Sequence, residues 1–147
     1  MDFYRLDEMR QHADQIRHAP RPGDPMKVLI VDDEPLVRCV LGYALSREGW
    51  EVFDHDQFAD CPALIREHGI DALISDYRMP GITGLDLIEN LRNAGIDIPV
   101  FILSGNVYAI DRERAKLLGV REILAKPPNL KVLSRTLMRA VGKGVIQ

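Results

Sequence analysis

The sequence has few cysteines, no long hydrophobic run and no block of positive charge, and each absence excludes a class of protein. Cys39 and Cys61 match neither a metal-binding spacing nor a disulfide framework. No apolar stretch approaches the roughly 18 residues of a membrane helix, and the charged N-terminus is unlike a signal peptide. A net charge of −3 without a Lys/Arg cluster argues against nucleic-acid binding. We therefore expect one cytoplasmic domain, with reduced, buried and unreactive thiols and no contact with membranes.

The sequence does contain short apolar segments that alternate with helical ones. Five segments rich in β-branched residues are typical of strands buried on both faces: 27–31, 50–54, 72–75, 99–103 and 122–125. Helical spacing and capping signals predict five helices. Four of them begin near Pro35, Asp60, Thr83 and Asn129, and the remaining one covers residues 107–118. This alternation predicts an α/β fold of the flavodoxin-like type, with a five-stranded parallel sheet in the order 2-1-3-4-5 and helices on both faces.

The two ends of the chain lie outside this alternation. We expect an N-terminal extension over 1–25, the α/β domain over 26–142 and a tail over 143–147. In the extension, Leu6 and three further apolar residues at helical spacing predict an amphipathic helix before the linker PRPGDP. That helix is either a loosely packed leader or a docking or dimerisation element.

Polar residues stand where four of the predicted strands end. Asp32 and Asp33 follow the first strand, Asp76 the third, Ser104 the fourth and Lys126 the fifth. The predicted strand order brings these ends together. Three adjacent carboxylates repel one another, and a hard cation such as Mg²⁺ (or Mn²⁺) removes that conflict. Each aspartate alone would suit a helix cap or a solvated strand end. Together with the Ser and the Lys they indicate phosphoryl transfer, with Asp76 as the nucleophile.

Four segments, VLIVDDEPLVR, LISDYRMPGITGLDLI, VFILSG and EILAKPP, occur in an order that resembles the receiver domain of two-component response regulators, over residues 27–141. The resemblance implies that Asp76 accepts a phosphoryl group from the phosphohistidine of a sensor histidine kinase or histidine phosphotransfer protein. It also implies that Asp33, Asp76 and the backbone carbonyl of Arg78 ligate Mg²⁺, with Asp32 acting largely through water.

The same resemblance assigns roles to the other strand ends. Lys126 would pair with the acyl phosphate, and its peptide bond to Pro127 is typically cis in this family. Ser104 would move to hydrogen-bond the phosphoryl group. That movement would shift the face formed by the fourth helix, fifth strand and fifth helix, where partners usually dock. The family also forms dimers through this face, so a homodimer is allowed.

Three positions are candidate modulators of this chemistry. Ile123 stands where the family usually has an aromatic residue, which indicates either a different switch or a neutral packing replacement. Arg78 would either affect the lifetime of the acyl phosphate or face solvent. Asn106 would either orient water or cap the fourth helix. Tyr77 and Tyr108 are expected to be packing or surface residues. All four histidines are interpreted as surface residues: His12, His18, His55 and His68.

Two other function classes share some of these residues. A phosphatase of the haloacid-dehalogenase type also uses Asp, Ser/Thr and Lys, but its nucleophile follows the first strand, whereas here the acidic pair comes first. A receiver-like domain that only binds or dimerises is the second alternative, and Ile123 keeps it open. The leading prediction is a signalling phosphoacceptor rather than a turnover enzyme, either stand-alone or part of a larger regulator or hybrid kinase.

Overall fold

The structure is a computed structural model that describes residues 23–142. The predicted amphipathic helix and the predicted tail lie outside the described residues. Within residues 23–142, no helix is long and apolar enough to cross a membrane.

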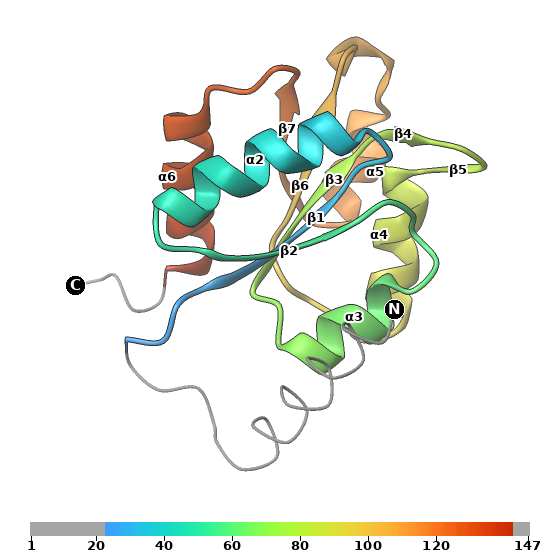
Figure 1. The fold of residues 1–147 in the computed structure, drawn as a ribbon. Helices are drawn as coiled ribbons and strands as arrows, with labels where there is room; N and C mark the ends of the chain where they lie inside the picture. The colour runs from blue at the N-terminus through green and yellow to red at the C-terminus, as the bar shows by residue number, and fades with distance from the viewer. Residues whose placement is uncertain (1–22, 143–147) are drawn as a thin grey trace.

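The centre of the fold is a five-stranded parallel sheet (Figure 1). Its strands are β1 (Lys27–Val31), β2 (Glu51–His55), β3 (Ala72–Asp76), β6 (Val100–Ser104) and β7 (Val120–Ala125). They lie in the order β2-β1-β3-β6-β7, and each pair is parallel. This is the predicted order 2-1-3-4-5, because the short strands β4 (Arg78–Met79) and β5 (Ile82–Thr83) form a separate antiparallel hairpin.

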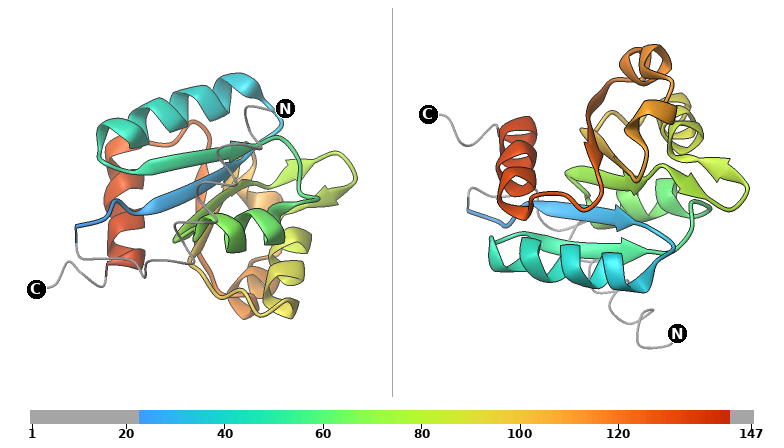
Figure 2. Two further views of the ribbon diagram at one scale, coloured as in Figure 1. Left: turned by 60° about the horizontal axis from the view of Figure 1, so that its bottom comes forward. Right: turned by 90° about the horizontal axis from the view of Figure 1, so that it is seen from above.

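Helices cover both faces of the sheet, as predicted (Figure 2). The helices are α2 (Pro35–Arg47), α3 (Cys61–His68), α4 (Gly84–Asn93), α5 (Arg112–Leu117) and α6 (Leu130–Val141). Helices α2 and α6 pack on one face through residues such as Leu41 and Leu137. Helices α3, α4 and α5 pack on the other through Ile65, Leu91 and Ala115. The two separate cores hold the sheet rigidly between them.

Burial differs between the central and the outer strands. All residues of β3 and β6 are buried, and so are four of the five in β1. In contrast, β2 has no fully buried residue, and neither has β7. Complete burial of these two segments was a wrong prediction, because each lies at an edge of the sheet and has a neighbour on one side only.

Two of the predicted helix starts have the expected caps. The Thr83 hydroxyl accepts from the Asp86 amide at 3.3 Å while the Asp86 carboxylate accepts from the Thr83 amide at 2.9 Å, which completes a capping box. The Asn129 side chain accepts from the amide of Val132. Asp60 occupies the N-cap position of α3, but its side chain makes no capping hydrogen bond.

The predicted helix over 107–118 is two elements in the structure. A single 3₁₀ turn, η1 (Val107–Ala109), precedes α5. Between them Ile110 is extended and buried, and Asp111 starts α5 by accepting from the amide of Arg114. Asn106 therefore caps η1 instead of the helix, through a 3.1 Å hydrogen bond from Tyr108 N. Burial of the Ile110 side chain accounts for the break, since a continuous helix would turn it differently.

The histidines and cysteines also differ partly from expectation. His68 is buried and its ring stacks on Phe53 with centroids 4.6 Å apart, so its interpretation as a surface residue was wrong. His55 is half-buried, while His12 and His18 lie outside the described residues. Cys61 is buried as expected, and burial raises the pKa of its thiol to about 12. Cys39 is exposed.

Gly84 is the glycine whose replacement we expect to damage both fold and site. A Cβ there would lie 2.8 Å from the backbone oxygen of Asp76, which is too close for a carbon. Gly84→Ala should therefore lower the free energy of unfolding by about 1–3 kcal/mol in urea denaturation.

Gly42 provides the matched control inside helix α2. A Cβ at Gly42 would meet the Val52 side chain at 3.5 Å, which is ordinary contact. Gly42→Ala should raise stability by about 0.5–1 kcal/mol, because alanine loses less conformational entropy in a helix. Equal effects of the two substitutions would contradict the close approach at Gly84.

Candidate functional site

The predicted site residues meet at the C-terminal edge of the sheet. Asp32 directly follows β1, Asp76 is the last residue of β3 and Ser104 the last of β6. Lys126 directly follows β7. Because these four strands are parallel and adjacent, their carboxyl ends lie at one edge. The strand order therefore explains why residues up to 94 positions apart are in contact.

Three carboxylates form the centre of the site. One oxygen each from Asp32, Asp33 and Asp76 lies within 4.8 Å of the other two. Asp32 and Asp76 are buried, at 1 % and 7 % exposure, while Asp33 is exposed. Several carboxylate oxygens this close, with one side open to water, are the donors that a hard divalent cation requires. The cluster could therefore hold a metal ion.

Lys126 reaches into this acidic cluster from the end of β7. Its ammonium lies 3.0 Å from Asp32 Oδ2 and 3.1 Å from Asp76 Oδ1. Burial lowers the pKa of the lysine, but hydrogen bonds to both carboxylates outweigh that effect, and the pKa is raised overall. The side chain is therefore a fixed positive charge beside the Asp76 carboxylate. The peptide bond to Pro127 is cis, as the resemblance predicted.

The carboxyl of Asp76 has a raised pKa. Burial is the main cause, and the negative charge of Asp32 adds to it. The hydrogen bond from Lys126 acts in the opposite direction but does not cancel these effects. An ionised Asp76 is thus less well solvated than a surface carboxylate, and such a perturbed group marks a candidate functional residue.

Two residues that sequence reasoning missed hold the acidic loop. The Glu34 amide donates to Asp32 Oδ1 at 2.9 Å, and the Glu34 carboxylate lies 3.4 Å from the Lys126 ammonium. The Arg38 guanidinium donates to the Asp32 backbone oxygen at 2.6 Å and to the Asp54 carboxylate at 3.2 Å. The Glu34–Lys126 pair and the Arg38 contacts bridge separate elements, and nothing in the local sequence signals them.

Ser104 lies one strand away from Asp76. The register pairs Asp76 with Leu103, so Ser104 is one position further along β6. Its side chain is buried, and its hydroxyl accepts from the Asn106 amide at 3.0 Å. Asn106 itself is exposed. The hydroxyl is therefore oriented by the loop after β6.

The remaining candidate positions lie around the cluster. Arg78 begins the hairpin next to Asp76 and its side chain is exposed. Ile123 is half-buried on β7 and packs against the core under α4 and α5. Tyr77 is half-buried against the same core, whereas Tyr108 is 92 % exposed, so both fit the expected packing and surface roles.

Comparison with known proteins assigns this arrangement to a family. The response regulator receiver domain matches residues 28–138. The chain belongs to this family. It is therefore a phosphoacceptor signalling domain of the two-component type. The five-stranded sheet and the site at its C-terminal edge agree with that membership.

Curated relatives carry this domain in larger proteins. The sensor histidine kinase RcsC of Salmonella typhimurium is 32% identical over 115 residues, which cover 78% of this chain and 12% of that protein. The probable transcriptional regulatory protein TcrX of Mycobacterium tuberculosis is 29% identical over 123 residues, covering 82% of this chain and 53% of that protein. The chain thus spans only part of the length of these relatives.

Solved structures show the same fold. The chemotaxis protein CheY4 of Vibrio cholerae matches with a TM-score of 0.72 and 28% identity, covering 79% of this chain and 98% of that chain. A response regulator receiver domain protein from Clostridium thermocellum matches with a TM-score of 0.73 and 26% identity, covering 81% and 96%. The family match and the structural matches therefore agree on a receiver domain and on its fold.

The raised pKa of Asp76 predicts a stability effect. The folded state holds the proton of the Asp76 carboxyl more tightly than the unfolded state does. The free energy of unfolding therefore falls as the pH rises from the unfolded-state pKa of this carboxyl to its folded-state pKa. Asp76→Asn should therefore raise the free energy of unfolding at pH 7 by roughly 1 kcal/mol in metal-free buffer. The advantage should shrink as the pH falls through the raised folded-state pKa toward the unfolded-state value near 4, and it should be absent below that value.

The control for this prediction is Asp56→Asn, which removes an exposed carboxylate and should change stability by less than about 0.5 kcal/mol. Added Mg²⁺ should stabilise wild type more than Asp76→Asn if the carboxylate helps to bind the ion. A variant that is less stable than wild type at pH 7 would contradict the destabilising effect of the buried charge.

Proposed function

We propose that Asp76 is the residue that accepts the phosphoryl group. The observation that carries this proposal is the contact between its buried carboxylate and Lys126, at the edge where Asp32 and Asp33 also lie. Of the three clustered aspartates, Asp76 alone ends a central strand of the sheet. The lysine beside it is placed to neutralise a phosphoryl oxygen.

We further propose that the acidic cluster binds Mg²⁺ (or Mn²⁺). Asp33 and Asp76 would be direct ligands, with the backbone carbonyl of Arg78, while Asp32 would act largely through water. The close approach of the three carboxylates supports this assignment. When bound, the ion would neutralise charge on the phosphoryl oxygens.

The residues around Asp76 account for the other parts of the transfer. An oxygen of Asp76 attacks the phosphorus of a phosphohistidine, the P–N bond breaks, and the imidazole nitrogen keeps the bonding electron pair. Lys126 holds one phosphoryl oxygen by charge. The Ser104 hydroxyl donates to another after it leaves the loop amide of Asn106. Water later hydrolyses the acyl phosphate, so the domain is a switch and not a turnover enzyme.

Three side chains would tune the lifetime and output of the phosphorylated state. Arg78 is exposed next to Asp76, where its guanidinium can shield the acyl phosphate from water. Asn106 is fixed at the loop that orients Ser104. Ile123 packs against the core and has no aromatic ring that could swing between a buried and an exposed position. The output would therefore come from a shift of strand β7.

Exposed apolar residues on helix α2 support the inference that the phosphodonor is a protein. Leu36, Val40 and Tyr43 are spaced along one face of the helix and are 74%, 47% and 65% exposed. This face, the α2 stripe, begins two residues after the site residue Glu34. We propose that it contacts a helix of a sensor histidine kinase or histidine phosphotransfer protein in the cytoplasm, where the two free cysteines stay reduced.

Intact mass tests the phosphoacceptor. Wild type incubated with acetyl phosphate and Mg²⁺ should gain one phosphoryl group, and Asp76→Asn should gain none. A chelator should abolish the adduct. After the donor is removed, the adduct should decay about tenfold faster in Arg78→Ala than in wild type, because the shielding guanidinium is gone. Equal decay rates would exclude a role for Arg78.

If wild type forms no adduct with acetyl phosphate, a second experiment decides whether the site can hold a phosphoryl group. Beryllofluoride with Mg²⁺ mimics the phosphoryl group and should bind wild type but not Asp76→Asn. If neither acetyl phosphate nor beryllofluoride acts on wild type, the domain is a phosphorylation-independent binding or dimerisation module. Turnover of a generic phosphomonoester would instead indicate a phosphatase.

The α2 stripe predicts a difference between two kinds of donor. Leu36→Ser should slow labelling by a phosphorylated histidine phosphotransfer protein roughly tenfold, because it removes an apolar contact from the interface. Labelling by acetyl phosphate should change less than twofold. Leu117→Ser, on exposed α5, is the matched control and should slow neither reaction. Equal slowing with both donors would show that the stripe acts on the site and not on docking.

A further inference from the structure

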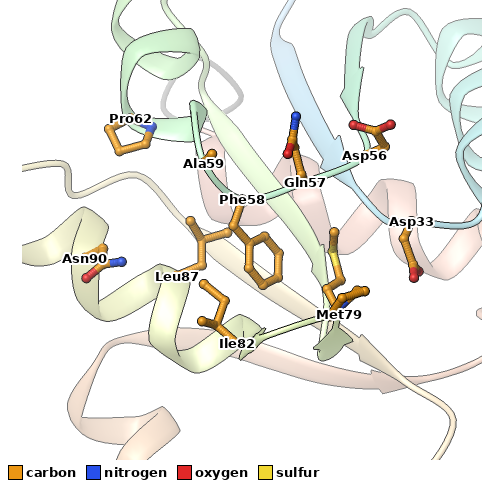
Figure 3. Close-up of a pocket in the computed structure, with 11 residues that line it drawn as sticks. Asp33, Asp56, Gln57, Phe58, Ala59, Pro62, Met79, Ile82, Leu87 and Asn90 are labelled. Carbon is orange, nitrogen blue, oxygen red and sulfur yellow. The ribbon is translucent and has the colours of Figure 1, made fainter.

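A groove beside the phosphorylation site shares only Asp33 with the proposed metal site, and its other lining residues take no part in the chemistry described above. It lies between the loop after β2, the β4–β5 hairpin and the start of α4, and has a cavity volume of about 490 Å³. Figure 3 shows the ring of Phe58 at its centre, with Leu87 and Ile82 on one side and Met79 on the other. We call it the hairpin groove.

The floor and walls of the hairpin groove are apolar. Phe58 and Leu87 form a buried floor, at 7% and 1% exposure. Ile82 is 38% exposed and lies on the wall formed by the hairpin, next to Met79. An exposed isoleucine over a buried aromatic floor leaves apolar surface in water that a partner could cover.

The rim of the groove is acidic. Figure 3 shows Asp33 and Asp56 at one end and Asn90 at the other. No lysine or arginine lines the groove, and within residues 23–142 neither aspartate forms an ion pair with a basic side chain. Asp60, on the same loop, is exposed as well. The charge of the groove is therefore negative, and a cation is the complementary group.

We propose that the hairpin groove binds a segment of a partner protein in which a lysine or arginine is flanked by aliphatic or aromatic residues. The apolar side chains lie on Phe58 beside Ile82, and the cation lies against the exposed carboxylate of Asp56. A protein segment fits better than a small molecule, because the rim residues Asp56, Gln57 and Pro80 are all exposed and the groove is open. This interaction is separate from the α2 stripe.

The test uses a capped heptapeptide of alanine with Leu-Lys-Leu at its centre, titrated into the ¹⁵N-labelled full chain in metal-free buffer. Amide shifts should concentrate in residues 56–62 and 79–90, with saturation at peptide concentrations on the order of millimolar. Peptides with Gln or Glu in place of Lys should bind more weakly, in that order. A peptide with Ser in place of both Leu residues should not bind.

Variants locate the two parts of the interaction. Asp56→Asn should weaken binding of the Lys peptide about two- to fivefold and leave the Gln peptide unaffected. Ile82→Ser should weaken both about fivefold. Glu48→Gln and Leu117→Ser, an exposed acid and an exposed leucine that do not line the groove, should change neither. The proposal is overturned if no peptide shifts these amides, if the Glu peptide binds as well as the Lys peptide, or if the groove variants bind like the controls.

Discussion

The site depends on a repulsion between carboxylates that the fold maintains. Asp32 and Asp76 are both buried, with Asp33 within 4.8 Å, and one lysine contacts the two buried groups. One positive charge cannot balance three negative ones, so the edge of the sheet keeps an excess of negative charge. A divalent cation and then a phosphoryl group with that cation are the partners that relieve it. The same repulsion that costs stability would thus favour binding of the proposed cation.

The rigidity of the central strands is what keeps these charges together. β1, β3 and β6 are packed on both faces, so the ends of the strands cannot move apart to separate Asp32 from Asp76. The close approach of Gly84 to the Asp76 backbone oxygen adds a second constraint from α4. The exposed loop residue Asp33 and the edge strand β7, which precedes Lys126, are packed less completely than these central strands.

The sequence was sufficient for the features that local patterns encode. The alternation of apolar and helical segments predicted the strand order and the polar residue at each strand end. The spacing between Thr83 and Asp86 predicted the helix cap at Thr83. The features it missed depend on contacts between distant residues. Burial of Ile110 splits the expected helix, stacking on Phe53 buries His68, and Arg38 bridges two elements by reaching a backbone oxygen. None of these contacts leaves a local pattern.

The position of Lys126 links the chemistry to the surface. The residue before it, Ala125, pairs with Ser104, and the Lys126 amide donates to the Ser104 oxygen at 2.9 Å. A phosphoryl group that draws the Lys126 and Ser104 side chains together therefore pulls on the ends of two paired strands at once. β6 is fully buried and cannot follow, whereas β7 is half-exposed and has no outer neighbour in the described sheet. Under the proposed chemistry the displacement would be directed into β7, and an aliphatic Ile123 on that strand would then respond to the state of Asp76.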